Sequence, residues 1–205
     1  MGKVSNLFSP RYYSTHLENH KEILEQFRPY LNDPKYFSND FDDVISKWGC
    51  EVKTTIGNDY AKDMPWENLK SLILQHGKKL VDSYQPTTTY DLFISMLWAN
   101  IYNKHDFQEI HNHVNGGAHF SFAYLLESDN SAQSSQFQFV NDDIFCKTIF
   151  PVNRFSDPVA STLYRPKQQQ GTLLIFPSNL KHHVTQHLSN TRRSTVSGNL
   201  TMSFA

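Results

Sequence analysis

The sequence has few cysteines, no excess of positive charge and no long apolar run. Among its 205 residues, lysine and arginine number 19 and aspartate and glutamate number 20, so we expect no nucleic-acid partner, which would need cations against its phosphates. The two cysteines, Cys50 and Cys146, form no Cys-X-X-Cys pair. Their placement argues against a disulfide framework or a zinc ribbon and favours the cytoplasm. Without a signal peptide or an apolar stretch of about 18 residues, we expect no membrane association.

What the sequence does contain is enough apolar material for one large domain. Hydrophobic residues make up 39% and aromatic residues 14% of the chain, which favours a single domain over residues 1–205. Residues 1–85 are predicted to form a helical flank. One helix is expected within STHLENHKEILEQFRPYL, with Ser14 or Thr15 as its N-cap, and another after Pro65 in PWENLKSLILQHGKKLVDSY.

The pattern changes after Thr87 to short β-branched and aromatic runs separated by polar turns. The runs are TYDLFISMLWANIY, HFSFAYLL, SQFQFVN, CKTIFPV, STLYRP, GTLLIFP, HHVTQHL and RSTVSGNLTMSF. This rhythm is typical of an antiparallel sandwich or barrel. We therefore predict a mainly β protein with a helical flank (α+β), in which residues 86–205 form a double-stranded β-helix, a jelly roll of the cupin-like kind.

A pair of histidines stands in this second half. His111 and His113 are separated by one residue, just before Gly116 and Gly117. In an extended strand, side chains at i and i+2 point to the same face, so both imidazoles aim at one point. This spacing favours a metal site that a distant residue completes.

The residue that completes the site is expected after the apolar strand of GTLLIFPSNLKHH. His182 and His183 both follow this strand after a short loop. Because adjacent residues on a strand point in opposite directions, at most one of the two faces the metal. A shell of imidazoles, or of two imidazoles and a carboxylate, leaves open positions on iron for oxygen and substrate.

Arg193 and Thr195 share a strand face eleven residues after His182. A guanidinium group can donate two parallel charge-assisted hydrogen bonds to a carboxylate, and a hydroxyl can donate a third. The pair therefore predicts a clamp for an anionic co-substrate.

These motifs together resemble the non-haem Fe(II)- and 2-oxoglutarate-dependent oxygenases. The matching order is His111-X-His113, then FPSNLKH ending at His182, then RRSTVSGN ending at Asn199. The chain is most similar to the small oxygenases common in phages and marine bacteria, in which a strand with Trp and Asn, here WANIY, comes before the histidine pair. The resemblance covers roughly residues 85–203, and the ordered set is more specific than any single motif.

The resemblance implies a dioxygenase, by expectation a hydroxylase, that couples decarboxylation of 2-oxoglutarate by O2 to C–H oxidation of a small-molecule or peptidyl substrate. It implies that His111 and His182 bind Fe(II) and that Arg193, assisted by Thr195, binds the distal carboxylate of 2-oxoglutarate. Three further strand residues are expected to hydrogen-bond the keto acid, namely Asn100, Tyr102 and Tyr124. The expected location becomes the host cytoplasm if the chain is encoded by a phage.

The sequence departs from the resemblance at His113, where most members of the superfamily have Asp or Glu. Three outcomes follow: His113 binds iron in a three-histidine site, His113 points away and leaves an open position, or Glu109, which shares its strand parity, supplies a carboxylate. We favour His113 as the ligand.

Two other functions fit the same fold. A cupin-type metal enzyme without 2-oxoglutarate would need no clamp at Arg193, and a non-catalytic phage structural or assembly protein would use the histidines for a structural zinc or for nothing. Within residues 1–85, the helices could buttress the sheet, mediate a homodimer or contact the substrate.

Overall fold

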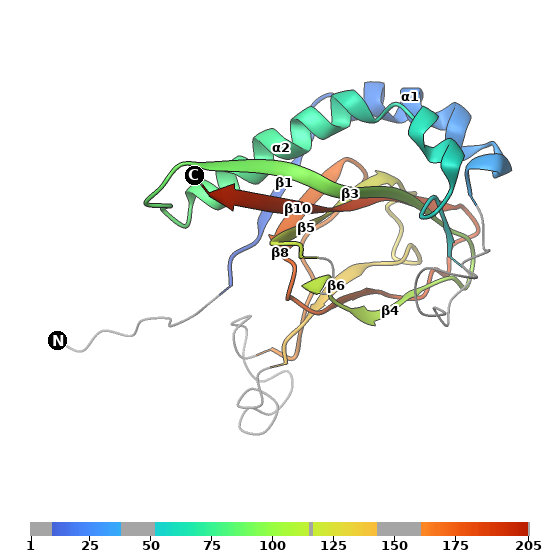
Figure 1. Cartoon of the computed structure of the whole chain (residues 1–205). Coiled ribbons are helices and arrows are strands. Elements are labelled where there is room, and N and C mark those ends of the chain that lie inside the picture. Colours follow the sequence, from blue (N-terminus) through green and yellow to red (C-terminus); the bar gives the residue numbers. More distant parts are fainter. Residues whose placement is uncertain (1–9, 38–51, 115–116, 143–160, 205) are drawn as a thin grey trace.

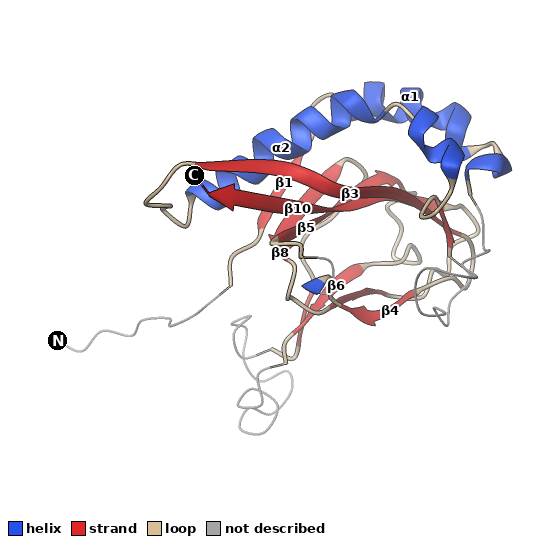
Figure 2. Cartoon of the chain, in the orientation of Figure 1, coloured by secondary structure: helices blue, strands red, loops and turns tan. Residues whose placement is uncertain are grey.

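Two antiparallel β-sheets face each other, and two α-helices lie along the outer face of the larger sheet (Figure 1). A computed structural model describes residues 10–37, 52–114, 117–142 and 161–204. Figure 2 shows α1 and α2 together on one side of the strands. The elements in chain order are β1 (Tyr13–His16), α1 (His20–Leu31), the 3-10 helix η1 (Pro34–Tyr36), β2 (Lys53–Thr54), the 3-10 helix η2 (Asp59–Asp63), α2 (Trp66–Asp82), β3 (Tyr90–Tyr102), β4 (Gln108–His111), β5 (Phe120–Glu127), β6 (Phe137–Val140), β7 (Leu163–Tyr164), β8 (Thr172–Pro177), β9 (His182–Val184) and β10 (Arg193–Phe204).

The larger sheet has the strand order β1-β8-β5-β10-β3-β2, and the smaller sheet has the order β4-β9-β6-β7. Every strand pairing in the described part of the chain is antiparallel. Strands that are distant in sequence lie side by side, because the chain alternates between the two sheets. The prediction of a mainly β, double-stranded β-helix fold with a helical flank is confirmed.

The described strands of the second half follow the predicted runs closely. The run RSTVSGNLTMSF is β10 in full, and GTLLIFP contains β8. HHVTQHL forms a strand only at its start, over His182–Val184. The run CKTIFPV falls on residues 146–152, which lie outside the described residues.

The N-terminal part is more than a helical flank. Ser14 and Thr15, predicted as helix N-caps, lie in β1, which pairs with β8 at the edge of the larger sheet. Helix α1 begins at His20, after Asn19. Strand β2 pairs with β3 at the opposite edge. Residues 1–85 therefore supply both edge strands of the larger sheet, a contribution that the helical prediction missed.

Helix α2 packs closely on the larger sheet through a glycine. A Cβ atom on Gly77 would lie 2.9 Å from Leu92 Cδ2 and 3.1 Å from Leu200 Cδ1. Leu69 and Ile73 of the same helix are fully buried in the core between helices and sheet. Burying such an apolar side chain contributes about 1.5–3 kcal/mol. Gly77, which weakens the helix as a sequence feature, here permits this close contact.

The two faces of the larger sheet have different surroundings. Val196 and Leu200 of β10 belong to the core that includes both helices, so their side chains mark the outer face. Tyr102 of β3 clusters with Phe137, Phe139 and other residues between the sheets. We call this second side the inner face, and residues on β3 and β10 alternate between the two. Among the described residues, no helix has the length and apolar character to cross a membrane.

Candidate metal centre

Two of the predicted histidines meet across a strand pair on the smaller sheet. His111 ends β4 and lies directly opposite His182, which begins β9. Residues directly opposite in an antiparallel pair present their side chains on the same face. The centroids of the two rings are 4.3 Å apart. The long-range pairing of β4 with β9 thus brings together residues that are 71 positions apart in the chain.

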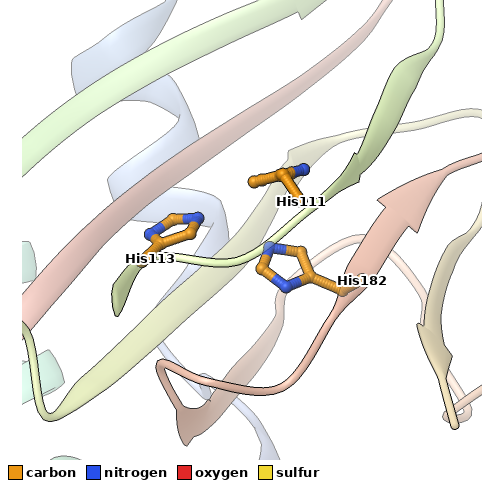
Figure 3. A group of neighbouring side chains, drawn as sticks. All are labelled: His111, His113 and His182. Carbon is orange, nitrogen blue, oxygen red and sulfur yellow. The ribbon is translucent and has the colours of Figure 1, made fainter. Parts of the chain in front are cut away.

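His113 joins them from the segment that follows β4. Its ring centroid lies 5.2 Å from that of His111 and 5.1 Å from that of His182. The three side chains point toward one another (Figure 3), and one nitrogen of each lies within 4.8 Å of the others. The structure therefore assembles the three-histidine group that the sequence predicted.

His183 does not belong to the group. It follows His182 on β9, and its Nε2 lies 3.2 Å from the side-chain amide of Gln138 on β6. This is the alternation expected for adjacent residues of a strand. Glu109 is not a member either: its carboxylate accepts a hydrogen bond of 2.9 Å from Gln108 Nε2. Its backbone carbonyl, in contrast, contacts the ring of His111.

Hydrogen bonds set the tautomer of all three histidines. In each ring Nδ1 faces a carbonyl-type oxygen, which can only accept, so Nδ1 carries the proton and Nε2 keeps a lone pair. This leaves three Nε2 atoms available as metal ligands. The Nδ1 partners are Glu109 O at 2.7 Å for His111, Asn199 Oδ1 at 2.6 Å for His113 and Leu180 O at 2.9 Å for His182.

Burial keeps the three imidazoles neutral. Desolvation lowers the pKa of His113 to about 4, lowers that of His111, and places that of His182 well below its usual value. A neutral imidazole needs to lose no proton before it binds a metal. At neutral pH the group is therefore ready to bind.

The donor set fits a catalytic transition metal. Imidazole nitrogens suit iron, zinc, copper and nickel, and three of them leave coordination positions open. Among the described histidines and carboxylates, this group is the one with ligand spacing. Aromatic rings border it: Phe137 stacks on His182 with centroids 5.1 Å apart, and Trp98 stacks on His113 at 5.8 Å. These rings limit the access of water to the histidines.

A buried cation lies on the inner face of the larger sheet. Arg193 is only 2% exposed, and its guanidinium carbon lies 5.0 Å from the ring centroid of Tyr102. Its Nε and Nη1 atoms are buried and have no hydrogen-bond partner among the described residues, and the same holds for Thr195 Oγ1. Burial lowers the pKa of Arg193, an effect that Tyr102 opposes. Such unsatisfied donors fit an anion.

The other predicted contacts divide between the two faces. Asn100 and Tyr102 pair with Thr195 and Arg193 across β3 and β10 and share their inner face. Tyr124 lies on the outer face. Its hydroxyl lies 2.6 Å from His20 Nδ1 of α1, and it is fully buried in the helix-facing core. Tyr124 is therefore removed from the predicted cofactor contacts, because the sheet separates its side chain from the inner face.

Sequence reasoning did not assign two residues that touch His113. Trp98 stacks on its ring, and Asn199 binds its Nδ1. The alternation of side chains along a strand could have identified both. Asn199 follows Arg193 and Thr195 at even spacing on β10, and Trp98 precedes Asn100 and Tyr102 at even spacing on β3, so each pair of strand neighbours shares one face.

The sequence matches the model of a known family. The model of a family described as "Putative 2OG-Fe(II) oxygenase" matches residues 96–199. This range contains the three histidines, Arg193 and Thr195. No curated protein matches the chain significantly.

Solved structures with a similar fold include several oxygenases. A prolyl-4-hydroxylase from Pseudomonas putida superposes with a TM-score of 0.61 at 12% identity, covering 93% of this chain and 91% of that one. EctD from S. alaskensis, solved with 2-oxoglutarate and 5-hydroxyectoine, has a TM-score of 0.61 at 12% identity, covering 93% and 71%. HygX from Streptomyces hygroscopicus, with nickel and 2-oxoglutarate bound, has a TM-score of 0.55 at 12% identity, covering 93% and 82%. At this identity the likeness concerns the fold.

Proposed function

This chain belongs to a family of 2OG-Fe(II) oxygenases, and we propose that His111, His113 and His182 hold its iron through their Nε2 atoms. The observation that carries the proposal is the shared orientation of the three rings, each with Nδ1 bonded to an acceptor. All three ligands are neutral, so the shell lacks the carboxylate of most superfamily members.

The enzyme uses 2-oxoglutarate and O2 with its iron. Bound together, these supply the oxidising power of the reaction, because decarboxylation of the keto acid to succinate and carbon dioxide provides electrons that activate O2 for C–H oxidation. The protein's own contribution is to bind, orient and exclude water. Three histidines leave coordination positions for the keto acid and O2, and Phe137 and Trp98 provide an apolar wall.

Arg193 binds the distal carboxylate of 2-oxoglutarate in this proposal. Its buried Nε and Nη1 atoms would donate to the carboxylate, and Thr195 Oγ1 would add a third hydrogen bond. Asn100 and Tyr102 line the same inner face as Arg193 and Thr195, which supports the proposal that they contact the keto acid. The buried donors of Arg193 and Thr195 also favour an enzyme that uses 2-oxoglutarate over a cupin-type enzyme that does not. Without the keto acid, these donors would stay unpaired.

The substrate is a small molecule or a peptidyl group, as the family implies, and hydroxylation is the simplest outcome of the proposed chemistry. The narrower resemblance to the phage and marine group stays a prediction, as do the cytoplasmic location and the homodimer.

The test is succinate formation from 2-oxoglutarate by protein that is purified without oxygen, loaded with Fe(II) and then exposed to air. Many oxygenases of this kind turn over the keto acid slowly without their substrate, so the assay needs no guess of its identity. We expect succinate that depends on iron and O2 and that is lost in His182→Ala. Folded protein that forms no succinate and binds neither Fe(II) nor 2-oxoglutarate in a calorimeter would refute the proposal.

A further inference from the structure

We infer that Asn199 is a positioning residue that makes His113 a metal ligand, by fixing both the tautomer and the orientation of its ring. The inference rests on the proposed function, since it concerns the third ligand of the same site. It adds a role for a residue of β10 that contacts neither the iron nor the keto acid in that proposal.

Asn199 reaches His113 from the larger sheet. Its Oδ1 lies 2.6 Å from His113 Nδ1, and Asn199 is 8% exposed. The same oxygen accepts a hydrogen bond of 3.1 Å from Ser121 Oγ. Ser121 lies directly opposite Asn199 on β5, so strand register brings the two side chains together. A short, partly buried hydrogen bond therefore joins the larger sheet to the segment that follows β4, at the metal group.

A serine after β8 completes the support. The hydroxyl groups of Ser121 and Ser178 lie 2.8 Å apart. The backbone carbonyl of Ser178 also accepts a hydrogen bond of 2.9 Å from the backbone N–H of His113. Ser178 thus holds the main chain of His113 directly and its side chain through Ser121 and Asn199. This support matters because β4 ends at His111, so His113 lies beyond the regular strand.

The direction of the Asn199 bond decides whether His113 can bind a metal. An amide oxygen only accepts, so His113 donates from Nδ1 and its Nε2 lone pair faces the other histidines. If the amide were turned by 180°, its NH2 group would donate to Nδ1 and the proton would move to Nε2. That tautomer cannot ligate through Nε2. Asn199 therefore determines the state of the third ligand.

His113 differs from the other two histidines in this dependence. The Nδ1 atoms of His111 and His182 bind backbone carbonyls, which no side-chain substitution removes. Of the three, His113 is the one with a side-chain partner at Nδ1. Its ligation is therefore sensitive to residue 199, and the identities of residues 113 and 199 are coupled. With Asp at position 113, the amide would instead turn to donate its NH2 group to the carboxylate.

The experiment measures Co(II) affinity by calorimetry and the His113 tautomer by nitrogen-15 NMR of the metal-free protein. Asn199→Leu keeps the branching of the side chain but removes the acceptor, and we expect about 10- to 100-fold weaker binding and loss of the pure Nδ1–H tautomer. Asn199→Asp keeps an acceptor and should restore both. Ser194→Ala, on the same strand but the opposite face, is the control and should change neither.

A coupling test uses the His113→Ala background, in which Asn199→Leu should weaken Co(II) binding no further. The inference is overturned if Asn199→Leu leaves the tautomer and the affinity as in the wild type while His111→Ala and His182→Ala abolish binding. If Asn199→Leu does not fold, Ser121→Ala is measured in its place. If His111→Ala and His182→Ala also bind Co(II) normally, the proposed metal centre itself is wrong. The two failures are therefore distinguishable.

Discussion

Replacing Arg193 by methionine should weaken binding of 2-oxoglutarate at least about a hundredfold without destabilising the protein. The guanidinium is buried, and two of its nitrogens have no hydrogen-bond partner among the described residues. A buried guanidinium with unpaired nitrogens costs folding free energy, and these nitrogens gain hydrogen-bond partners only when an anion binds. Methionine fills much of the same volume without carrying a charge.

The magnitude follows from the hydrogen bonds. A hydrogen bond to a charged group contributes about 1.5–3 kcal/mol, so losing two weakens 2-oxoglutarate binding by at least about 3 kcal/mol, or roughly a hundredfold. In the ligand-free protein, removing the unpaired donors relieves about 1–3 kcal/mol for each, while loss of the contact with Tyr102 costs about 0.5–2 kcal/mol. The unfolding free energy of the variant should therefore be unchanged or higher.

The assay is calorimetry of 2-oxoglutarate with Mn(II)-loaded protein, together with thermal unfolding with and without the keto acid. Arg192→Met is a matched control on the neighbouring residue. Arg192 donates to Glu127 Oε2 at 2.6 Å and to the Leu31 carbonyl at 3.0 Å, so its loss should lower stability by about 1–3 kcal/mol and leave 2-oxoglutarate affinity intact.

The reasoning fails if the two arginines behave in the opposite way. Arg193→Met protein that unfolds at a clearly lower temperature and is still stabilised by 2-oxoglutarate would mean that Arg193 is a structural residue. In the wild type, saturating keto acid should raise the unfolding temperature, because a ligand that binds only the folded state stabilises it.

Three further substitutions separate the metal centre from the core. His182→Ala should abolish Co(II) binding, whereas His183→Ala should have a small effect, because its ring faces Gln138; the reverse order in a metal titration would move the ligand by one residue. Gly198→Ala should destabilise the fold by about 1–3 kcal/mol, since a Cβ atom there would lie 2.5 Å from the Phe122 ring; chemical denaturation measures this, and unchanged stability would contradict the packing.

Much of the β architecture was predictable because its strands carry local signals. β-branched and aromatic runs between turn residues mark β3, β5, β8 and β10 within a residue or two. The edge strands β1 and β2 carry no such signal. Ser14 and Thr15 suit a helix N-cap as well as a strand, and only pairing with β8, more than 150 residues away, makes this segment extended.

The members of the site could be predicted where the alternation of side chains along a strand was clear from the sequence, and not elsewhere. His111 and His113 are two residues apart, and the choice of His182 over His183 follows from the same rule together with the family resemblance. Tyr124 was misplaced because β5 is buried on nearly all of its length, so hydropathy does not distinguish its faces. The role of Asn199 depends on a contact between sheets, which no single segment of sequence encodes.

Strand β10 shows how function and stability occupy alternate residues of one element. In the proposed function, Arg193 and Thr195 form the clamp and Asn199 supports His113 on the inner face, whereas Val196 and Leu200 are fully buried in the outer core. Both faces are buried, so an apolar core alone would favour apolar residues at every position. Burying polar side chains costs free energy unless they are paired. The polar side chains of the inner face are therefore best explained by the ligands that the proposed function assigns to them, and substitutions on the two faces should affect binding and unfolding separately.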